Sequence, residues 1–404
     1  MSAVSFSKTE ALVVVHRVTA IDLLRALTMV LMIFVNDLWS LKDIPLWLEH
    51  VDRGVDGIGL ADVVFPAFLF IVGLSMPYAV EARKKKGHTT AQLILHVLTR
   101  SLALIVMGVF LVNGENINGD ATGIPRLVWN TLCCTCFILI WNSYPARLPS
   151  KLGYAAKGVG IATLFLLALL YRGGGRDEIQ YFGPQWWGIL GLIGWAYFAS
   201  GVVTVLANNK FIVVFFAWIF FCILSMISHA GLLPAALDFI PGAILGGTLT
   251  GLTMGGVVTS LIFRYYRSRN EDRLMTVVMF GMASVLVALS IVTRPYWGLA
   301  KLGDTPAWLF LCSAFTIMAL IVVYWIADVM GKAHWFNVIR PAGTNTLLCY
   351  LIPYFAYAMT NLLGIHLPDF MLIGAVGLAK SLLFALLCVV ITGWLGKAGI
   401  KLKL

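Results

Sequence analysis

Apolar residues fill the chain in long runs, and short polar stretches separate these runs from one end to the other. Twelve runs approach the roughly twenty residues that a helix needs to cross a bilayer. The pattern predicts an all-α, polytopic transmembrane helix bundle of ten to twelve spans, forming one domain over 1–404. The twelve expected spans lie near residues 20–41, 59–81, 92–112, 124–143, 154–171, 185–207, 211–229, 237–263, 274–293, 306–330, 341–363 and 370–395.

Composition supports the same class of protein. Of the 404 residues, 60% are hydrophobic and 12% are charged, whereas a soluble domain carries about 25% charged residues. The net charge of +10 would suggest a nucleic-acid partner in a soluble protein. Here the basic residues concentrate in alternate loops, so we expect the lipid bilayer as a partner and no nucleic acid.

The alternation of basic residues predicts the topology. Basic residues are dense in every second loop, as in 83–86 and 264–273, and sparse in the loops between. Cytoplasmic loops carry the excess of Lys and Arg. Both termini are therefore expected in the cytoplasm of a cell whose inner membrane holds the protein. The loop that carries His50 is expected on the opposite, periplasmic side.

Polar residues follow one face of the first expected helix. Asp22, Arg25, Met29 and Asn36 share this face, because residues three, four and seven apart stack along a helix. Asn36 lies about 21 Å beyond Asp22 at the helical rise. One interpretation is a wall of a pathway across the membrane. The other is an Asp22–Arg25 pair that only fixes helix packing.

The next loop supplies a candidate base. A neutral imidazole is suited to take a proton from an amine or hydroxyl near pH 7, and His50 sits between two polar helix ends. Glu49 and Asp52 are close enough in sequence to orient it. Asp62 falls in the first turn of the second helix, where it is either a cap favoured by the helix dipole or part of a site.

Basic residues at the expected cytoplasmic ends are candidates for binding phosphates. Arg17, Arg25, Arg100 and Arg340 lie at such ends, and guanidinium groups bind phosphate through two hydrogen bonds. The alternative is that they only anchor the helices at the membrane surface. Asn345, in an early polar cluster of the eleventh span, either joins helices or lines a cavity. No cysteine or histidine spacing indicates a metal site.

These residues carry a resemblance to a known family. The segment RVTAIDLLRALTMVLMIFVND, at 17–37, and the segment LEHVDRGVDGIGLADVVFPAFLFIVGLSMP, at 48–77, resemble the heparan-α-glucosaminide N-acetyltransferase family. Weaker similarity continues through RPAGTNTLLCYLIPY, so the resemblance covers about 17–365. The chain departs from the family pattern at Trp129 and Asn130 in the fourth span, and at Ala26 in the first.

The resemblance implies transfer of an acetyl group across a membrane. Acetyl-CoA would be supplied from the cytoplasm, and the acceptor would be a glucosamine-type amine on the periplasmic side. His50 would act as general base or as acetyl carrier. Asn36 would donate a hydrogen bond to the developing oxyanion, and Asp62 would orient His50. Family members also form dimers, so a homodimer is expected.

Two other functions fit the same pattern. Twelve spans with both termini inside also suit a transporter of an amino sugar or of N-acetylglucosamine, although paired broken helices are not evident. An O-acyltransferase that modifies a surface glycan is the other alternative. Stabilisation by CoA would favour the acyltransferases, and stabilisation by N-acetylglucosamine alone would favour the transporter.

Overall fold

The computed structural model describes residues 18–145, 149–175, 178–185 and 188–404. The described part is a bundle of α-helices, in which extended backbone pairs only at isolated bridges. Arg17, a predicted phosphate-binding residue, lies outside the described residues. The longer helices are α1 (Thr19–Asp37), α2 (Leu60–Lys84), α3 (Thr90–Glu115), α5 (Arg126–Trp141), α6 (Ser150–Leu170), α7 (Ile189–Leu206), α8 (Phe211–His229), α10 (Thr248–Arg267), α11 (Asp272–Trp297), α12 (Pro306–Tyr324), α14 (Thr346–Leu362) and α15 (Gly374–Lys397).

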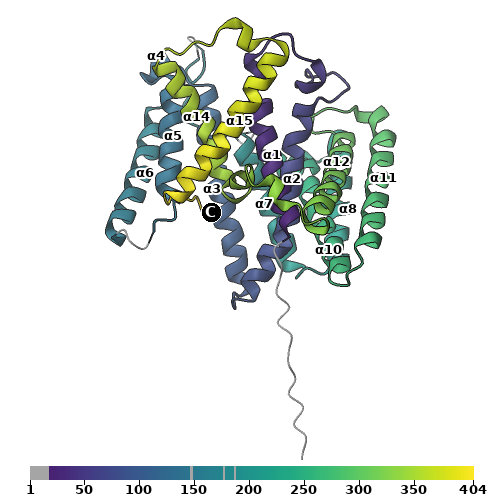
Figure 1. The fold of residues 1–404 in the computed structure, drawn as a ribbon. Helices are drawn as coiled ribbons and strands as arrows, with labels where there is room; N and C mark the ends of the chain where they lie inside the picture. The colour runs from purple at the N-terminus through teal and green to yellow at the C-terminus, as the bar shows by residue number, and fades with distance from the viewer. Residues whose placement is uncertain (1–17, 146–148, 176–177, 186–187) are drawn as a thin grey trace, which may run out of the picture.

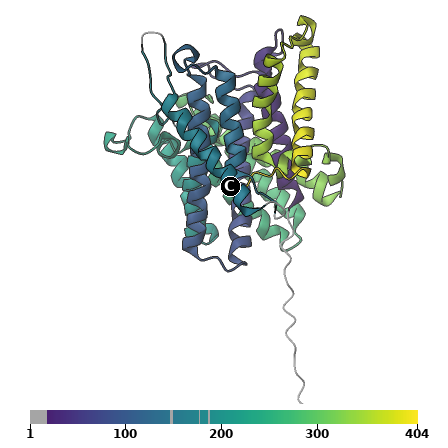
Figure 2. The same ribbon diagram turned by 90° about the vertical axis from the view of Figure 1, so that its left-hand side faces the viewer.

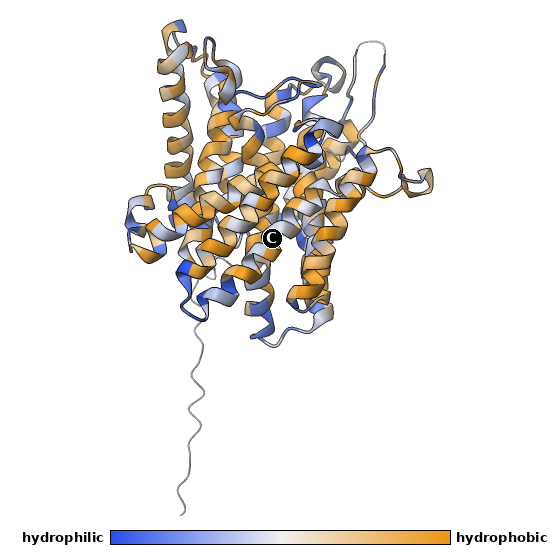
Figure 3. Ribbon diagram, turned by 90° about the vertical axis from the view of Figure 1, so that its right-hand side faces the viewer, coloured by the Kyte–Doolittle hydropathy of each residue, from blue (hydrophilic) through white to orange (hydrophobic). Residues whose placement is uncertain are grey.

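Each of the twelve predicted spans overlaps one of these helices, which confirms the all-α polytopic class. Nine helices among the described residues are long and apolar enough to cross a membrane. Helices α5 and α14 have 16 and 17 residues, and α10 is less apolar than the nine. The number of crossings and the side of each terminus stay predictions. Apolar positions cover the helices, and hydrophilic ones gather at their ends and in loops (Figure 3).

Helix α1 lies at the centre of the bundle (Figures 1 and 2). It packs against α2 and α12 and also against α14 and α15, so helices distant in sequence meet around it. A short helix, α13 (Arg340–Thr344), packs against its first half. Of the 19 residues of α1, most are buried, because neighbours surround it on several sides. Any path along the predicted polar face of α1 therefore runs inside the protein.

Glycines allow the closest helix contact, between α2 and α10. A Cβ atom at Gly73 would overlap the carbonyl oxygen of Thr253, and one at Gly256 would overlap that of Phe70. The sequence pattern Gly247, Gly251, Gly255 predicts close packing on α10. The structure agrees on that role, but the nearest backbone approach to α2 is at Gly256.

Candidate active site

His50 and Asp62 form a hydrogen-bonded pair. Nδ1 of His50 lies 2.7 Å from Oδ1 of Asp62; the Asp62 side chain is 2% exposed and that of His50 is 47% exposed. At this distance a proton must lie between the two atoms, because a carboxylate oxygen and an imidazole lone pair repel each other. In the neutral ring Nε2 then carries the free lone pair. The arrangement suits a base or nucleophile oriented by a carboxylate.

Asp62 is fixed by the start of α2 and by the loop that carries His50. Its Oδ2 accepts hydrogen bonds from the backbone N–H groups of Gly59 at 3.0 Å and Val51 at 3.1 Å. The indole Nε1–H of Trp308, on α12, donates to the Asp62 carbonyl at 3.0 Å. From the sequence, Asp62 was either a helix cap or part of a site. Its carboxylate caps α2 through the N–H of Gly59 and also contacts His50. Among the described residues, Asp62 is hydrogen-bonded to the His50 ring, whereas no hydrogen bond or ion pair joins Glu49 or Asp52 to it.

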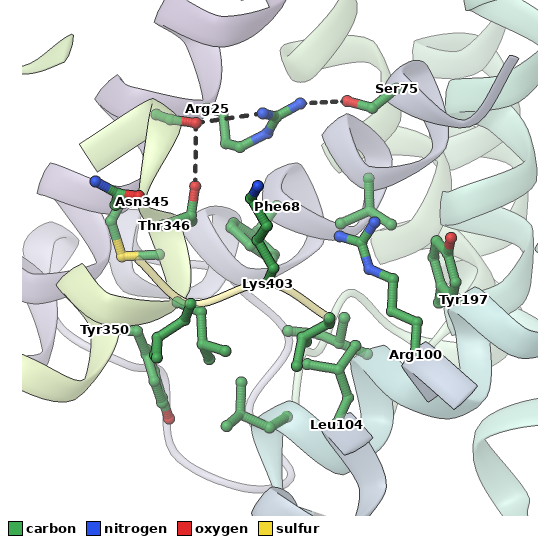
Figure 4. A pocket seen from close by; sticks show the side chains of 18 of the residues that line it. Arg25, Phe68, Ser75, Arg100, Leu104, Tyr197, Asn345, Thr346, Tyr350 and Lys403 are labelled. Carbon is green, nitrogen blue, oxygen red and sulfur yellow. Dashed lines mark hydrogen bonds between the residues drawn. The ribbon is translucent and has the colours of Figure 1, made fainter. Parts of the chain in front are cut away.

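A cavity of about 450 Å³ lies among α1, α2, α3, α7 and the segment from α13 to α14. We call it the basic cavity, because four cations and no acid are among its described lining residues: Arg25, Arg83, Arg100 and Lys403. Figure 4 shows three of them, from α1, α3 and the C-terminal segment, facing the same space. A cavity of this size and charge suits a small-molecule phosphate ligand.

The cations of the basic cavity differ in how many hydrogen-bond and ion-pair partners they have. Arg25 pairs with Asp22 at 3.2 Å and donates to the Gly343 carbonyl at 3.3 Å and to Ser75. Arg100 stacks over the Tyr197 ring, 4.8 Å from its centroid. Its Nε is buried without a hydrogen-bond partner among the described residues. A buried, unsatisfied guanidinium N–H is costly, so Arg100 is well placed to receive an anion.

Two other residues predicted for the donor site, Asn345 and Arg340, lie at or beside this cavity. Asn345 lines it, as one of the two interpretations of that residue expects. Arg340 lies outside, in an adjoining depression that shares Asn345 and Lys403 with it. Sequence reasoning missed Lys403, because a basic residue near the end of a chain looks like a topology determinant.

A second cavity, of about 690 Å³, lies among α1, α5 and α14. We call it the aromatic cavity after its lining residues Trp39, Tyr350, Tyr354 and Tyr357. Asn36 also lines it. Met32 and Tyr350 line both cavities, so these two side chains stand between them. Arg25, Met29, Met32 and Asn36 thus follow one face of α1 from the first cavity to the second, as the spacing predicts.

A buried charge pair adjoins the aromatic cavity. Asp37 accepts from Lys380 Nζ at 2.7 Å, from the Ser381 hydroxyl at 2.6 Å and from the Tyr357 hydroxyl at 2.8 Å. These bonds join α1 to α14 and α15. Lys380 was not identified from the sequence, although a charged residue inside an apolar run is the signal that points to such a pair.

His50 and Asn36 are not brought together. Both belong to the region where α1 ends and α2 begins, but no hydrogen bond joins them in the described part of the chain. His50 is also absent from the described lining of either cavity. Instead Lys301, in the loop between α11 and α12, lies 3.3 Å from Nδ1 of His50. The sequence had placed Lys301 among the sparse basic residues of that side and in the segment AKLGDTPAW, at 300–308, which also resembles the family, without giving it a role.

Comparison with known proteins finds similarity to one family. Residues 17–122 match the family described as heparan-alpha-glucosaminide N-acetyltransferase, catalytic. The chain is 24% identical over 378 residues to the heparan-alpha-glucosaminide N-acetyltransferase of Mus musculus, covering 83% of the chain and 53% of that protein. It is 24% identical over 379 residues to the protein of that name from Homo sapiens, covering 83% and 52%. The chain thus spans about half the length of these relatives.

Proposed function

Because residues 17–122 match the family described as heparan-alpha-glucosaminide N-acetyltransferase, catalytic, and the chain is 24% identical to two proteins of that name, we propose that it is a multi-pass membrane acetyltransferase of that family. It moves the acetyl group of cytoplasmic acetyl-CoA to the amine of an amino sugar on the periplasmic side. The observation that carries the proposal is the pair of cavities along one face of α1. The first is basic, and the second begins beyond Met32 and Tyr350.

The donor binds in the basic cavity. CoA carries several phosphate charges, which Arg25, Arg100 and Lys403 neutralise, and the unsatisfied Nε–H of Arg100 donates to one of them. Arg340, in the adjoining depression, attracts the anion at the mouth. The pantetheine arm is thin enough to pass between Met32 and Tyr350 toward the aromatic cavity. The thioester then reaches Asn36, whose amide donates to the carbonyl oxygen as negative charge develops there.

His50 acts on the acceptor. As general base, its Nε2 takes a proton from the amine as the nitrogen attacks the acetyl carbonyl carbon. A C–N bond forms, the C–S bond breaks, and the sulfur leaves as the CoA thiolate, which then receives a proton. As acetyl carrier, Nε2 itself attacks the thioester and later gives the acetyl group to the amine. Asp62 orients the ring in both cases. Both require the acetyl thioester and Nε2 of His50 to come within reach of each other.

Transfer from labelled acetyl-CoA to glucosamine by the purified protein tests the proposal. The expected product is N-acetylglucosamine, and the His50→Ala protein should make none. Labelled protein recovered without acceptor would identify an acetyl-His50 intermediate, and its absence would favour the direct route. A folded His50→Ala protein with full transfer would refute the role of His50.

Binding of the donor can be tested separately. CoA should raise the thermal midpoint of the wild-type protein and raise that of Arg100→Gln much less. The matched control is Arg269→Gln, because Arg269 also stacks on a tyrosine, 3.8 Å from the centroid of Tyr265, but does not line the basic cavity. If CoA does not stabilise the protein and N-acetylglucosamine does, the proposed enzyme function fails and a transporter function is favoured.

A further inference from the structure

The loop over 298–305, between α11 and α12, brings a second charged group to His50. Nζ of Lys301 lies 3.3 Å from Nδ1 of His50, the same nitrogen that is 2.7 Å from Oδ1 of Asp62. The Lys301 side chain is partly buried. Burial lowers its pKa, and the carboxylates of Asp62 and Asp304 oppose that effect. The carboxylates of Asp62 and Asp304 favour the ammonium form of Lys301, which lies beside the candidate base.

Contacts on one side tie this loop to the His50 loop. Asp56 accepts from the backbone N–H of Leu299 at 2.8 Å and pairs with Arg294 at 3.0 Å. The N–H of Gly57 donates to the Leu299 carbonyl at 2.9 Å. The two loops therefore hold each other close to the position of Lys301.

Contacts on the other side tie the loop to the bundle. Nε2 of His229, on α8, lies 2.7 Å from the Gly303 carbonyl, and the Thr248 hydroxyl donates to the Asp304 carbonyl at 2.5 Å. A lysine on a loop held from both sides has fewer positions open to its side chain than one on a free surface loop. Its place next to His50 is thus built into the fold.

Lys301 cannot act on His50 as a hydrogen-bond donor while Asp62 holds its present place. Nδ1 has a single hydrogen-bonding position in the ring plane, and the shorter contact to Asp62 uses it with a proton on Nδ1. An ammonium group has N–H donors and no acceptor, so at Nδ1 it faces another N–H group and forms no hydrogen bond. What remains is its charge, which disfavours a second proton on the ring.

We propose that Lys301 is a positioning residue for His50. The ammonium group of Lys301 keeps the imidazole of His50 neutral, with a proton on Nδ1 and an available lone pair on Nε2. The inference rests on the proposed function for the use made of that lone pair. Asp62 alone would favour the doubly protonated ring, which is neither base nor nucleophile. The other ionisable groups that act on Lys301 are Asp304 in its own loop and Cys312 on α12.

Chemical modification of His50 measures this effect without any acetyl transfer. Diethyl pyrocarbonate reacts with neutral imidazole, so the rate of carbethoxylation of the His50 peptide of the full chain, followed by mass spectrometry across pH, reports the neutral fraction. In Lys301→Met and Lys301→Gln the pH midpoint should rise by about one unit, the size expected for one charge a few ångströms from a half-exposed ring. Lys301→Arg should keep the wild-type midpoint.

The matched control is Lys42→Met, which removes an exposed lysine of the His50 loop whose backbone alone is hydrogen-bonded. An unchanged midpoint in both neutral Lys301 variants, or an equal rise in Lys42→Met, would overturn the inference. The acid limb of kcat/KM should move with the labelling midpoint. If labelling moves and the activity limb does not, the role of Lys301 stands and the role of His50 in transfer fails.

Discussion

Asp62→Asn separates the orienting role of Asp62 from its structural role. The wild-type carboxylate divides its bonds, since Oδ2 accepts from both backbone N–H groups and Oδ1 faces the imidazole. An asparagine can place its carbonyl oxygen where Oδ2 lies and keep both backbone bonds. Its NH₂ group then faces Nδ1 and donates to it. His50 is left with its proton on Nε2, the tautomer that can neither accept a proton there nor attack.

The magnitudes follow from these bonds. Asp62→Asn exchanges charge-assisted bonds for neutral ones, which costs about 1–2 kcal/mol of unfolding free energy. Acetyl transfer should fall by about 10²–10⁴-fold, the range seen when a base is held in the wrong tautomer. Asp62→Ala removes all three bonds and leaves two N–H groups without this acceptor, which should cost about 3–5 kcal/mol.

The assay compares transfer from labelled acetyl-CoA with the thermal midpoint of the same preparation. Asp52→Asn is the matched control, because it removes an exposed carboxylate of the same loop. We expect Asp62→Asn to be folded and nearly inactive, and Asp52→Asn to match wild type in both measurements. Wild-type transfer by Asp62→Asn would refute the assignment of Asp62 as the group that orients His50.

Three further substitutions test other parts of the account. Burial raises the pKa of Asp304 to about 6, so ionisation of this carboxyl destabilises the folded protein as pH rises through that value. Asp304→Asn should therefore raise the unfolding free energy by up to about 3 kcal/mol at pH 8 and by less as pH falls toward 4. An equal gain at all pH values in thermal unfolding would contradict this. Lys380→Met leaves Asp37 buried without its cation and should cost about 3–5 kcal/mol of unfolding free energy, whereas a thermal midpoint like that of wild type would contradict the pairing. Met32→Trp should block passage between the cavities, so CoA still stabilises the protein but transfer is lost; full transfer would place the acyl path elsewhere.

The sequence predicted the elements of this protein well, because a bilayer demands long apolar runs that are visible without a structure. It also predicted the line of residues on α1, since helical periodicity alone places Arg25, Met29 and Asn36 on one face. Asn345 and Arg100 were expected to share a site, and both line the basic cavity.

What the sequence did not predict depends on contacts between distant segments. Lys301 and His50 are 251 positions apart, and Lys380 and Asp37 are 343 apart. No local sequence pattern predicts either contact. The separation of His50 from Asn36 also depends on contacts outside the loop between them, because His50 is held at the start of α2 by its bond to Asp62.

The most direct test of the central claim is the sidedness of acetyl transfer. The protein would be placed in proteoliposomes in one orientation, with acetyl-CoA on the side of the basic cavity and glucosamine on the side of His50. The account predicts N-acetylglucosamine in the compartment that holds the amine, and none with His50→Ala. Product only when both substrates share the side of the basic cavity would contradict transfer across the membrane.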